Sequence, residues 1–179
     1  MAGNRVGTID DRVKVKTVLL SVSDKSALET LVRGILAANP GVQFLSTGGT
    51  HSALQTLLGA SASSTLRQVS DYTGQPEMQG GLVKTLDFKI YLGLLSETYN
   101  AAHTADLART GAAVIDMVVV NLYPFQQTVA AARANLEDAR ANIDIGGPCL
   151  CAPPRRTSTA WPLSLIHRTT RPSWMSFRS

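Results

Sequence analysis

The sequence predicts an α/β domain in which helices cover both faces of a mainly parallel sheet, giving three layers. Apolar runs typical of strands alternate along the chain with segments whose apolar residues recur at helical spacing. The run from Val118 to Val120 is apolar at consecutive positions, which is typical of a strand buried on both faces. The chain has 179 residues, 44% hydrophobic and 17% charged, which suits one stable core.

The chain begins with a predicted strand, helix and strand. The first strand lies within residues 13–23, VKVKTVLLSVS, which are rich in β-branched and apolar side chains. Residues 24–39 predict a helix closed by Asn-Pro-Gly. Residues 42–49, VQFLSTGG, predict the second strand. The helix is predicted because its apolar residues fall on one face: Leu28, Leu31, Val32, Ile35 and Leu36.

A short helix is predicted next, over residues 50–59, THSALQTLLG. Thr50 is its expected N-cap, because a threonine hydroxyl can accept a hydrogen bond from the first helical turn. Gly59 is its expected end. Residues 64–70, STLRQVS, predict the third strand.

The second half of the chain starts with a stretch rich in Gly, Pro and Gln at residues 71–81, which interrupts the alternation. Residues 89–96 are apolar again, and residues 100–111 are expected to be helical. Residues 113–125, AVIDMVVVNLYPF, contain the strongest predicted strand. Residues 126–142 are expected to be helical, in one or two pieces.

Composition excludes several classes of protein. No run of about 18 apolar residues occurs, so no transmembrane helix is expected. The polar N-terminus lacks a signal core, and Cys149 and Cys151 are expected to be reduced thiols, so we expect a cytoplasmic protein without membrane association. The spacing of His and Cys predicts no metal site.

The net charge of +4 originates in the last part of the chain. Residues 1–150 contain 12 Lys and Arg against 13 Asp and Glu, whereas residues 151–179 contain five arginines and no acidic residue. The basic balance therefore gives no indication that the domain binds nucleic acid. We predict a domain over residues 1–150 and an atypical basic tail, rich in Pro, Arg, Ser and Thr, over residues 151–179.

Polar or glycine-containing motifs follow several predicted strands, where ligands bind in open α/β sheets. The motif STGGT puts two glycines at a helix N-terminus, where backbone N–H groups can bind a phosphate; a tight turn with an N-cap explains it equally well. The motif SVSDK could add Ser23 and Lys25 to the same anion, although its Ser23 or Asp24 could simply cap a helix. STGGT comprises Ser46, Thr47, Gly48, Gly49 and Thr50.

Other candidate residues could transfer protons or stabilise charge. Lys84 lies in GGLVKTLDFK, with Lys89 further on, and could be a proton donor or oxyanion partner if held in a partly dry site. Tyr123 in NLYPF could act as an acid or be a core aromatic residue. Asp144 in NIDIGGP could be catalytic or form an Asx turn.

Taken together and in this order, SVSDK, STGGT, VSDYTGQPEM, VKTL, NLYPF and IDIGGP resemble IMP cyclohydrolase over about residues 15 to 150. That family is usually the N-terminal domain of the bifunctional enzyme for the last two steps of purine biosynthesis. The resemblance implies a methylglyoxal-synthase-like fold, a homodimer, and closure of the formamido-imidazole-carboxamide ribotide to IMP with loss of water. It implies no cofactor and no metal.

The resemblance also implies roles for individual residues. A catalytic set is implied at Lys84, Tyr123 and Asp144. Contacts to the purine ribotide are implied at Ser23, Lys25, Ser46, Thr47, Gly48, Gly49, Thr50, Thr85, Asn121, Gly146 and Gly147.

The chain also departs from the family pattern. Leu82 stands where the family usually has arginine, and Asp87-Phe88-Lys89 replaces a His-Pro-Lys segment. The family continues after IDIGGP with RAAAKN, which contains a further catalytic lysine. A one-base shift in frame after Leu150 permits this sequence, with the lysine at the position of Arg156. We therefore interpret the tail as a frame-shifted segment and expect the printed chain to be impaired; a genuine basic extension is the alternative.

Two other functions share the expected fold. A methylglyoxal-synthase-type lyase would use a similar phosphate loop, but the other motifs of that enzyme have no counterpart here. A regulatory module that binds a phosphate ligand would use the loop without a catalytic set.

Overall fold

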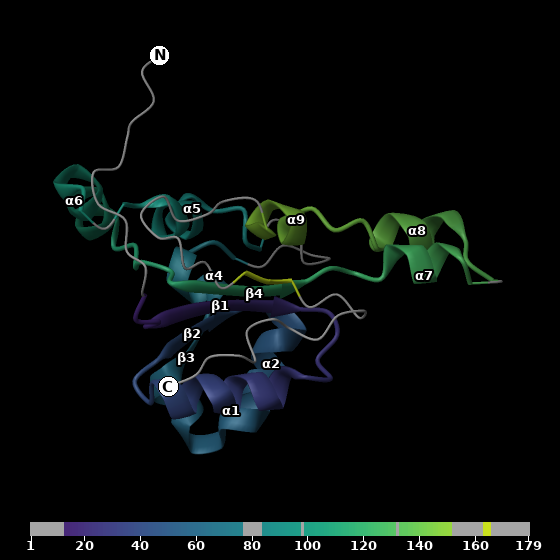
Figure 1. Cartoon of the computed structure of the whole chain (residues 1–179). Helices are drawn as coiled ribbons and strands as arrows, with labels where there is room; N and C mark the ends of the chain where they lie inside the picture. Colours follow the sequence, from purple (N-terminus) through teal and green to yellow (C-terminus); the bar gives the residue numbers. More distant parts are fainter. Residues whose placement is uncertain (1–12, 77–83, 98, 132, 152–162, 166–179) are drawn as a thin grey trace, which may run out of the picture.

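The computed structural model describes residues 13–76, 84–97, 99–131, 133–151 and 163–165. Its centre is a five-stranded sheet in which every pairing is parallel, in the order β3-β2-β1-β4-β5 (Figure 1). The predicted parallel sheet is confirmed. The strands are β1 (Thr17–Val22), β2 (Gln43–Ser46), β3 (Leu66–Gln68), β4 (Met117–Asn121) and β5 (Leu163–Leu165).

Helices cover both faces of this sheet (Figure 1). On one face lie α1 (Leu28–Ala38) and α2 (Gly48–Leu58). The other face carries α4 (Val69–Thr73), α5 (Phe88–Leu95), α6 (Ala101–Thr110) and α9 (Gly146–Cys151). The short helices η1 (Gly59–Ser61) and α3 (Ala62–Thr65) connect α2 to β3.

The helices α7 (Phe125–Val129) and α8 (Leu136–Ala141) pack against each other and project beyond the end of the sheet (Figure 1). We call residues 122–145 the arm. It follows the carboxyl end of β4, whereas α6 lies at the opposite end of the sheet. The helical prediction for residues 126–142 is confirmed in its two-piece form.

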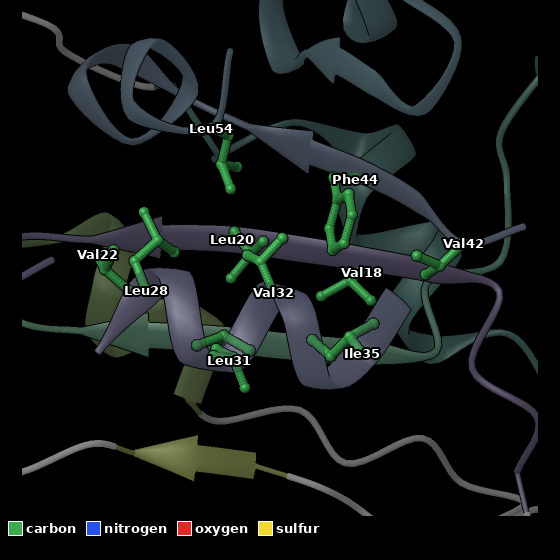
Figure 2. Packing of buried hydrophobic residues seen from close by; sticks show 11 residues of the cluster. Val18, Leu20, Val22, Leu28, Leu31, Val32, Ile35, Val42, Phe44 and Leu54 are labelled. Carbon is green, nitrogen blue, oxygen red and sulfur yellow. The ribbon is translucent and has the colours of Figure 1, made fainter. Parts of the chain in front are cut away.

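The side chains of β1 alternate between two hydrophobic clusters. Val18, Leu20 and Val22 face α1, where Figure 2 shows them packed with its apolar side chains. Leu19 points to the opposite face and joins a cluster that includes Ile90 of α5. This alternation buries both faces of β1, which produces the three layers. Burying each leucine stabilises the fold by about 1.5–3 kcal/mol.

The start of α2 differs from its prediction. The helix begins at Gly48, and Thr47 rather than Thr50 occupies the N-cap position. The Thr50 hydroxyl does not cap the helix because it bonds to the backbone of Val22 instead. Gly59 ends α2 as predicted, with a left-handed φ of 55°.

Two further segments acquire definite structure. Residues 89–96, which the sequence showed only as apolar, lie mostly in α5. Within the predicted tail, β5 extends the sheet beside β4 in parallel register. The predicted domain boundary at residue 150 stays a prediction, and Leu82 and Arg156 lie outside the described residues. In the described ranges, no helix is long and apolar enough to cross a bilayer.

Candidate functional site

The predicted motifs meet at one edge of the sheet because the parallel strands end there together. The backbone register pairs Leu20 of β1 with Ser46, the last residue of β2. On the other side of β1, Val22 pairs with Asn121, the last residue of β4. The turns after β1, β2 and β4 therefore lie side by side, as expected for the ligand edge of an open α/β sheet.

The STGGT turn is anchored in the core by two of its hydroxyl groups. Ser46 Oγ, which is fully buried, donates to the carbonyl of Leu20 at 2.8 Å. Thr50 Oγ1 accepts from the Val22 amide at 3.0 Å and donates to the Val22 carbonyl at 2.9 Å. Both hydroxyls thus fix the turn to β1, and the backbone between them is the part that remains to receive a ligand.

That backbone forms the first turn of α2. Thr47 makes no side-chain cap hydrogen bond, and its Oγ1 lies 3.5 Å from Ser21 Oγ. Gly48 adopts a left-handed φ of 46°, which favours glycine. A helix N-terminus without a capping carboxylate carries partial positive charge, so the turn suits an anion.

Two lysines approach this turn. A methyl group added at Gly48 would lie 2.7 Å from Lys84 Nζ, and one added at Gly49 would lie 3.8 Å from Lys25 Nζ. Lys25 Nζ also donates to the Ser23 carbonyl at 3.2 Å. The structure therefore brings two ammonium groups to adjacent glycines at a helix N-terminus. Each ammonium group and the helix N-terminus favour binding of an anion.

Asn121 holds the loop that carries Lys25. Its Oδ1 accepts from the amides of Ser23 and Asp24, and its Nδ2 donates to the Asp24 carbonyl at 2.7 Å. These three bonds join the SVSDK loop to the end of β4. In this structure the Asn121 side chain positions the loop.

Asp144 organises the other half of the edge. Its Oδ1 accepts from the Gly147 amide at 2.8 Å, and its Oδ2 accepts from the Tyr123 amide at 3.3 Å. The Tyr123 side chain is 51% exposed. The bond from Gly147 spans three residues, not the two of an Asx turn, and the carboxylate ties the arm to α9.

Thr85 connects the two halves. Its side chain is buried, and its Oγ1 lies 2.8 Å from where a Cβ on Gly146 would be. Lys84 and Thr85 are neighbours in the chain, so one segment contacts both the STGGT turn and the start of α9. Lys84 itself lies beside Gly48, on the Lys25 side of the edge.

The sequence analysis missed the structural role of Asp87, two residues after Thr85. Asp87 is 4% exposed and caps α5 by accepting from the Lys89 amide at 2.7 Å. An Asp two residues before an apolar run was a usable N-cap signal. Lys89 donates to the Tyr72 carbonyl at 3.4 Å, which joins α5 to the end of α4.

Near Cys149, partial burial alters the pKa of a tyrosine in α5. Burial raises the pKa of Tyr91, and the neighbouring Cys149 raises it further, so the phenol stays neutral well into the alkaline range. Cys149 is a free thiol, as predicted. In the portion of the chain that the structure describes, no three His, Cys, Asp or Glu side chains cluster as a metal site would require.

Comparison with known proteins gives the family. Residues 28–149 match the family described as MGS-like domain. The chain is 47% identical to the bifunctional purine biosynthesis protein PurH of Magnetococcus marinus, over 76% of this chain and 24% of that protein. It is 46% identical to PurH of a Synechococcus species, over 74% of this chain and 24% of that protein.

The chain thus spans about a quarter of the length of these curated relatives. A solved structure, the crystal structure of ForH, matches with a TM-score of 0.56 and 29% identity, covering 77% of this chain and 66% of that one. The fold, the motifs at the sheet edge and these matches agree: the chain belongs to the family of MGS-like domains.

Proposed function

We propose that this domain is an IMP cyclohydrolase, which closes 5-formamidoimidazole-4-carboxamide ribotide to IMP with loss of water. The similarity to bifunctional purine biosynthesis proteins supports a role in purine biosynthesis. The proposal of cyclohydrolase activity rests on one observation. Lys25 and Lys84 lie beside Gly49 and Gly48, at the edge of the sheet that also holds Asp144.

The STGGT turn would bind the ribotide phosphate. Backbone N–H groups at the start of α2 and the ammonium of Lys25 would contact its oxygens. Ser46 and Thr50 would act indirectly, because their hydroxyls hold the turn against β1. Asn121 would likewise hold Ser23 and Lys25 in place.

Ring closure then requires proton transfer and stabilisation of charge. The carboxamide nitrogen attacks the formyl carbon, forming a C–N bond and a tetrahedral oxyanion. Lys84 would stabilise that oxyanion and Tyr123 could donate a proton to it, while Asp144 accepts the proton that the nitrogen loses. The resulting hydroxyl then takes a second proton and leaves as water, while the former formamido nitrogen loses its proton and forms the C=N bond of the purine ring. The resemblance implies that no cofactor or metal takes part.

We further propose that the domain functions as a homodimer in the cytoplasm. The arm supports self-association because a group of large apolar side chains is exposed on it, and such groups commonly mark protein interfaces. The exposed apolar residues of the arm are Leu122, Tyr123, Phe125, Val129, Leu136, Ile143 and Ile145. Sedimentation velocity tests this: a monomer at every concentration would contradict it.

An ultraviolet assay with the formylated ribotide tests the activity directly. The printed chain and a chain that carries the family's RAAAKN sequence at positions 152–157 should be compared, each with and without chelator. We expect IMP from the continued chain and much less from the printed chain. Binding of IMP with no turnover by either chain would overturn the proposal and favour a regulatory module that binds phosphate ligands.

Resequencing the gene across the codon for Leu150 tests the frame-shift hypothesis separately. A confirmed printed frame, together with turnover at a rate typical of enzymes, would contradict both the frame-shift hypothesis and the need for a lysine at position 156.

A further inference from the structure

We propose that Asp87 is a positioning residue that holds Lys84 against the STGGT turn. The catalytic part of this inference rests on the proposed function, in which Lys84 stabilises the oxyanion. Asp87 stands where the family pattern has histidine, so its role is a property of this chain's own sequence.

The first step of the argument is burial. Thr85 and Asp87 are both nearly inaccessible to solvent, at 5% and 4% exposed. An ionised carboxylate is costly to bury unless hydrogen bonds compensate it. Asp87 Oδ1 obtains one from the Lys89 amide at 2.7 Å. Burial and this hydrogen bond therefore hold the carboxylate in place. The carboxylate in turn holds the backbone at the start of α5.

The second step is the attachment of α5 to its neighbours. The Lys89 side chain donates to the Tyr72 carbonyl at the end of α4, and the hydroxyl of Tyr72 accepts from the Ala113 amide at 2.7 Å. Ile90 is fully buried in the sheet cluster. The helix that Asp87 caps is consequently anchored at its first turn by Lys89 and Ile90, five and six residues beyond Lys84, and Asp87 lies between this anchor and Lys84.

The third step is the contact of Lys84 itself. Its Nζ lies 2.7 Å from where a Cβ on Gly48 would be, so the missing side chain of Gly48 leaves room for the ammonium beside the turn. A displacement of about 1 Å at a reacting group can cost on the order of 100-fold in rate. Because so few residues separate Lys84 from Asp87, loss of the cap should move the ammonium by a distance that affects turnover.

The test uses Asp87→Ala in the full chain, with Asn100→Ala as the matched control. Asn100 caps α6 by accepting from the amides of Ala102 and His103, and α6 lies at the opposite end of the sheet (Figure 1). Both changes remove one N-cap, so both should lower the melting temperature. We expect only Asp87→Ala to lower kcat, about tenfold or more, with a smaller change in KM.

A second readout does not require activity. Labelling with an amine-reactive reagent, followed by peptide mass spectrometry, gives the rate at which Lys84 reacts. We expect Lys84 to react several-fold faster in Asp87→Ala than in the original chain or in Asn100→Ala. Asp87→Asn and Asp87→Ser, which keep an acceptor for the cap, should restore the original rate.

The outcomes are distinguishable. If neither the original chain nor the chain continued with RAAAKN shows turnover, the proposed function fails, and the labelling rates still decide the role of Asp87. Equal labelling of Lys84 in the original chain and in Asp87→Ala would overturn the positioning role. If Asp87→Ala does not fold, Asp87→Gly takes its place, since glycine is tolerated at N-cap positions while lacking the acceptor.

Discussion

The two halves of the ligand edge are held in different ways. On the STGGT side, Ser46, Thr47 and Thr50 are buried, and two of their hydroxyls bond to β1 in the middle of the core. On the arm side, Tyr123 is half exposed, and the Asp144 carboxylate joins it to Gly147 through two backbone hydrogen bonds.

This difference shows which part of the site the fold itself secures. A turn bonded to a central strand can open only if the core loosens, so under the proposed function the geometry that would bind the phosphate is present before a ligand arrives. The arm side depends on a few local bonds and on whatever covers its apolar residues. Under the proposed function, the rigid half would bind the phosphate group common to many ribotides, and the reacting ring would lie between Lys84 and the adaptable half.

The largest expected effect comes from the reacting groups. Lys84→Ala and Asp144→Ala should each lower kcat by about 10²–10³-fold, because each removes charge stabilisation or proton transfer used mainly in the transition state. The affinity for IMP should change much less. Steady-state kinetics and calorimetry measure the two effects, with Lys16→Ala, an exposed lysine elsewhere in the chain, as the control.

Equal losses of affinity and turnover in both variants would contradict this division. They would mean that Lys84, which lies beside Gly48, serves mainly to bind the phosphate.

The next largest effect is on the free energy of unfolding, and it tests how firmly the STGGT side of the edge is held compared with the arm side. Thr50→Val removes both hydrogen bonds to Val22 and leaves buried backbone groups without partners, which should cost about 1–3 kcal/mol in the free energy of unfolding. Thr56→Val is the control, because its exposed hydroxyl bonds only to the Ser52 carbonyl within α2. Urea denaturation measures both.

Leu136→Ala extends the same comparison to the arm. Leu136 is 87% exposed, so a monomer should lose no more than about 0.5 kcal/mol. A loss as large as that for Thr50→Val would show that the arm is covered in solution.

A smaller effect is expected at Lys25. Because a phosphate contact is made in substrate and transition state alike, Lys25→Ala should weaken IMP binding by about tenfold and leave kcat nearly unchanged. Raising the salt concentration should narrow the difference between Lys25→Ala and the original chain, since Lys25 is exposed and its attraction is screened. A fall in kcat without loss of binding would contradict the assignment.

The smallest expected effect is a dependence of the free energy of unfolding on pH that arises from Tyr72. Burial raises the pKa of Tyr72 above its ordinary value near 10. Stability from this group is therefore complete below about pH 10, where the phenol is neutral in both states, and is lost as pH rises through the folded pKa. Urea midpoints measured from neutral to alkaline pH should fall less steeply in Tyr72→Phe. An identical slope in both proteins would exclude Tyr72 as a contributor.

Much of this arrangement could be predicted from the sequence because a few apolar runs are enough to identify the central strands. The apolar runs around Leu19 and Val119 fix two buried strands, and parallel strands place their following loops at one edge. The residue pattern alone therefore predicts that Ser23, Gly48 and Asn121 lie near one another.

Other features depended on contacts that no local pattern encodes. Residues 89–96 are apolar nearly throughout, and such a run does not distinguish a buried helix from a strand. Thr50 has the residue type of an N-cap, but the Val22 backbone competes for its hydroxyl. The closeness of Lys84 to Gly48 and the pairing of β5 with β4 depend on how distant segments pack.

The backbone conformation at Gly48 also constrains how this sequence can change over time. Any residue with a side chain at position 48 would be strained by the left-handed φ, and the Lys84 ammonium, at the end of a flexible side chain, would have to shift away from it. Shortening Lys84 would relieve this contact but not the backbone strain. The strain therefore disfavours every residue but glycine at position 48, whichever residue stands at position 84, and substitutions of Gly48 should be rare among functional descendants of this chain.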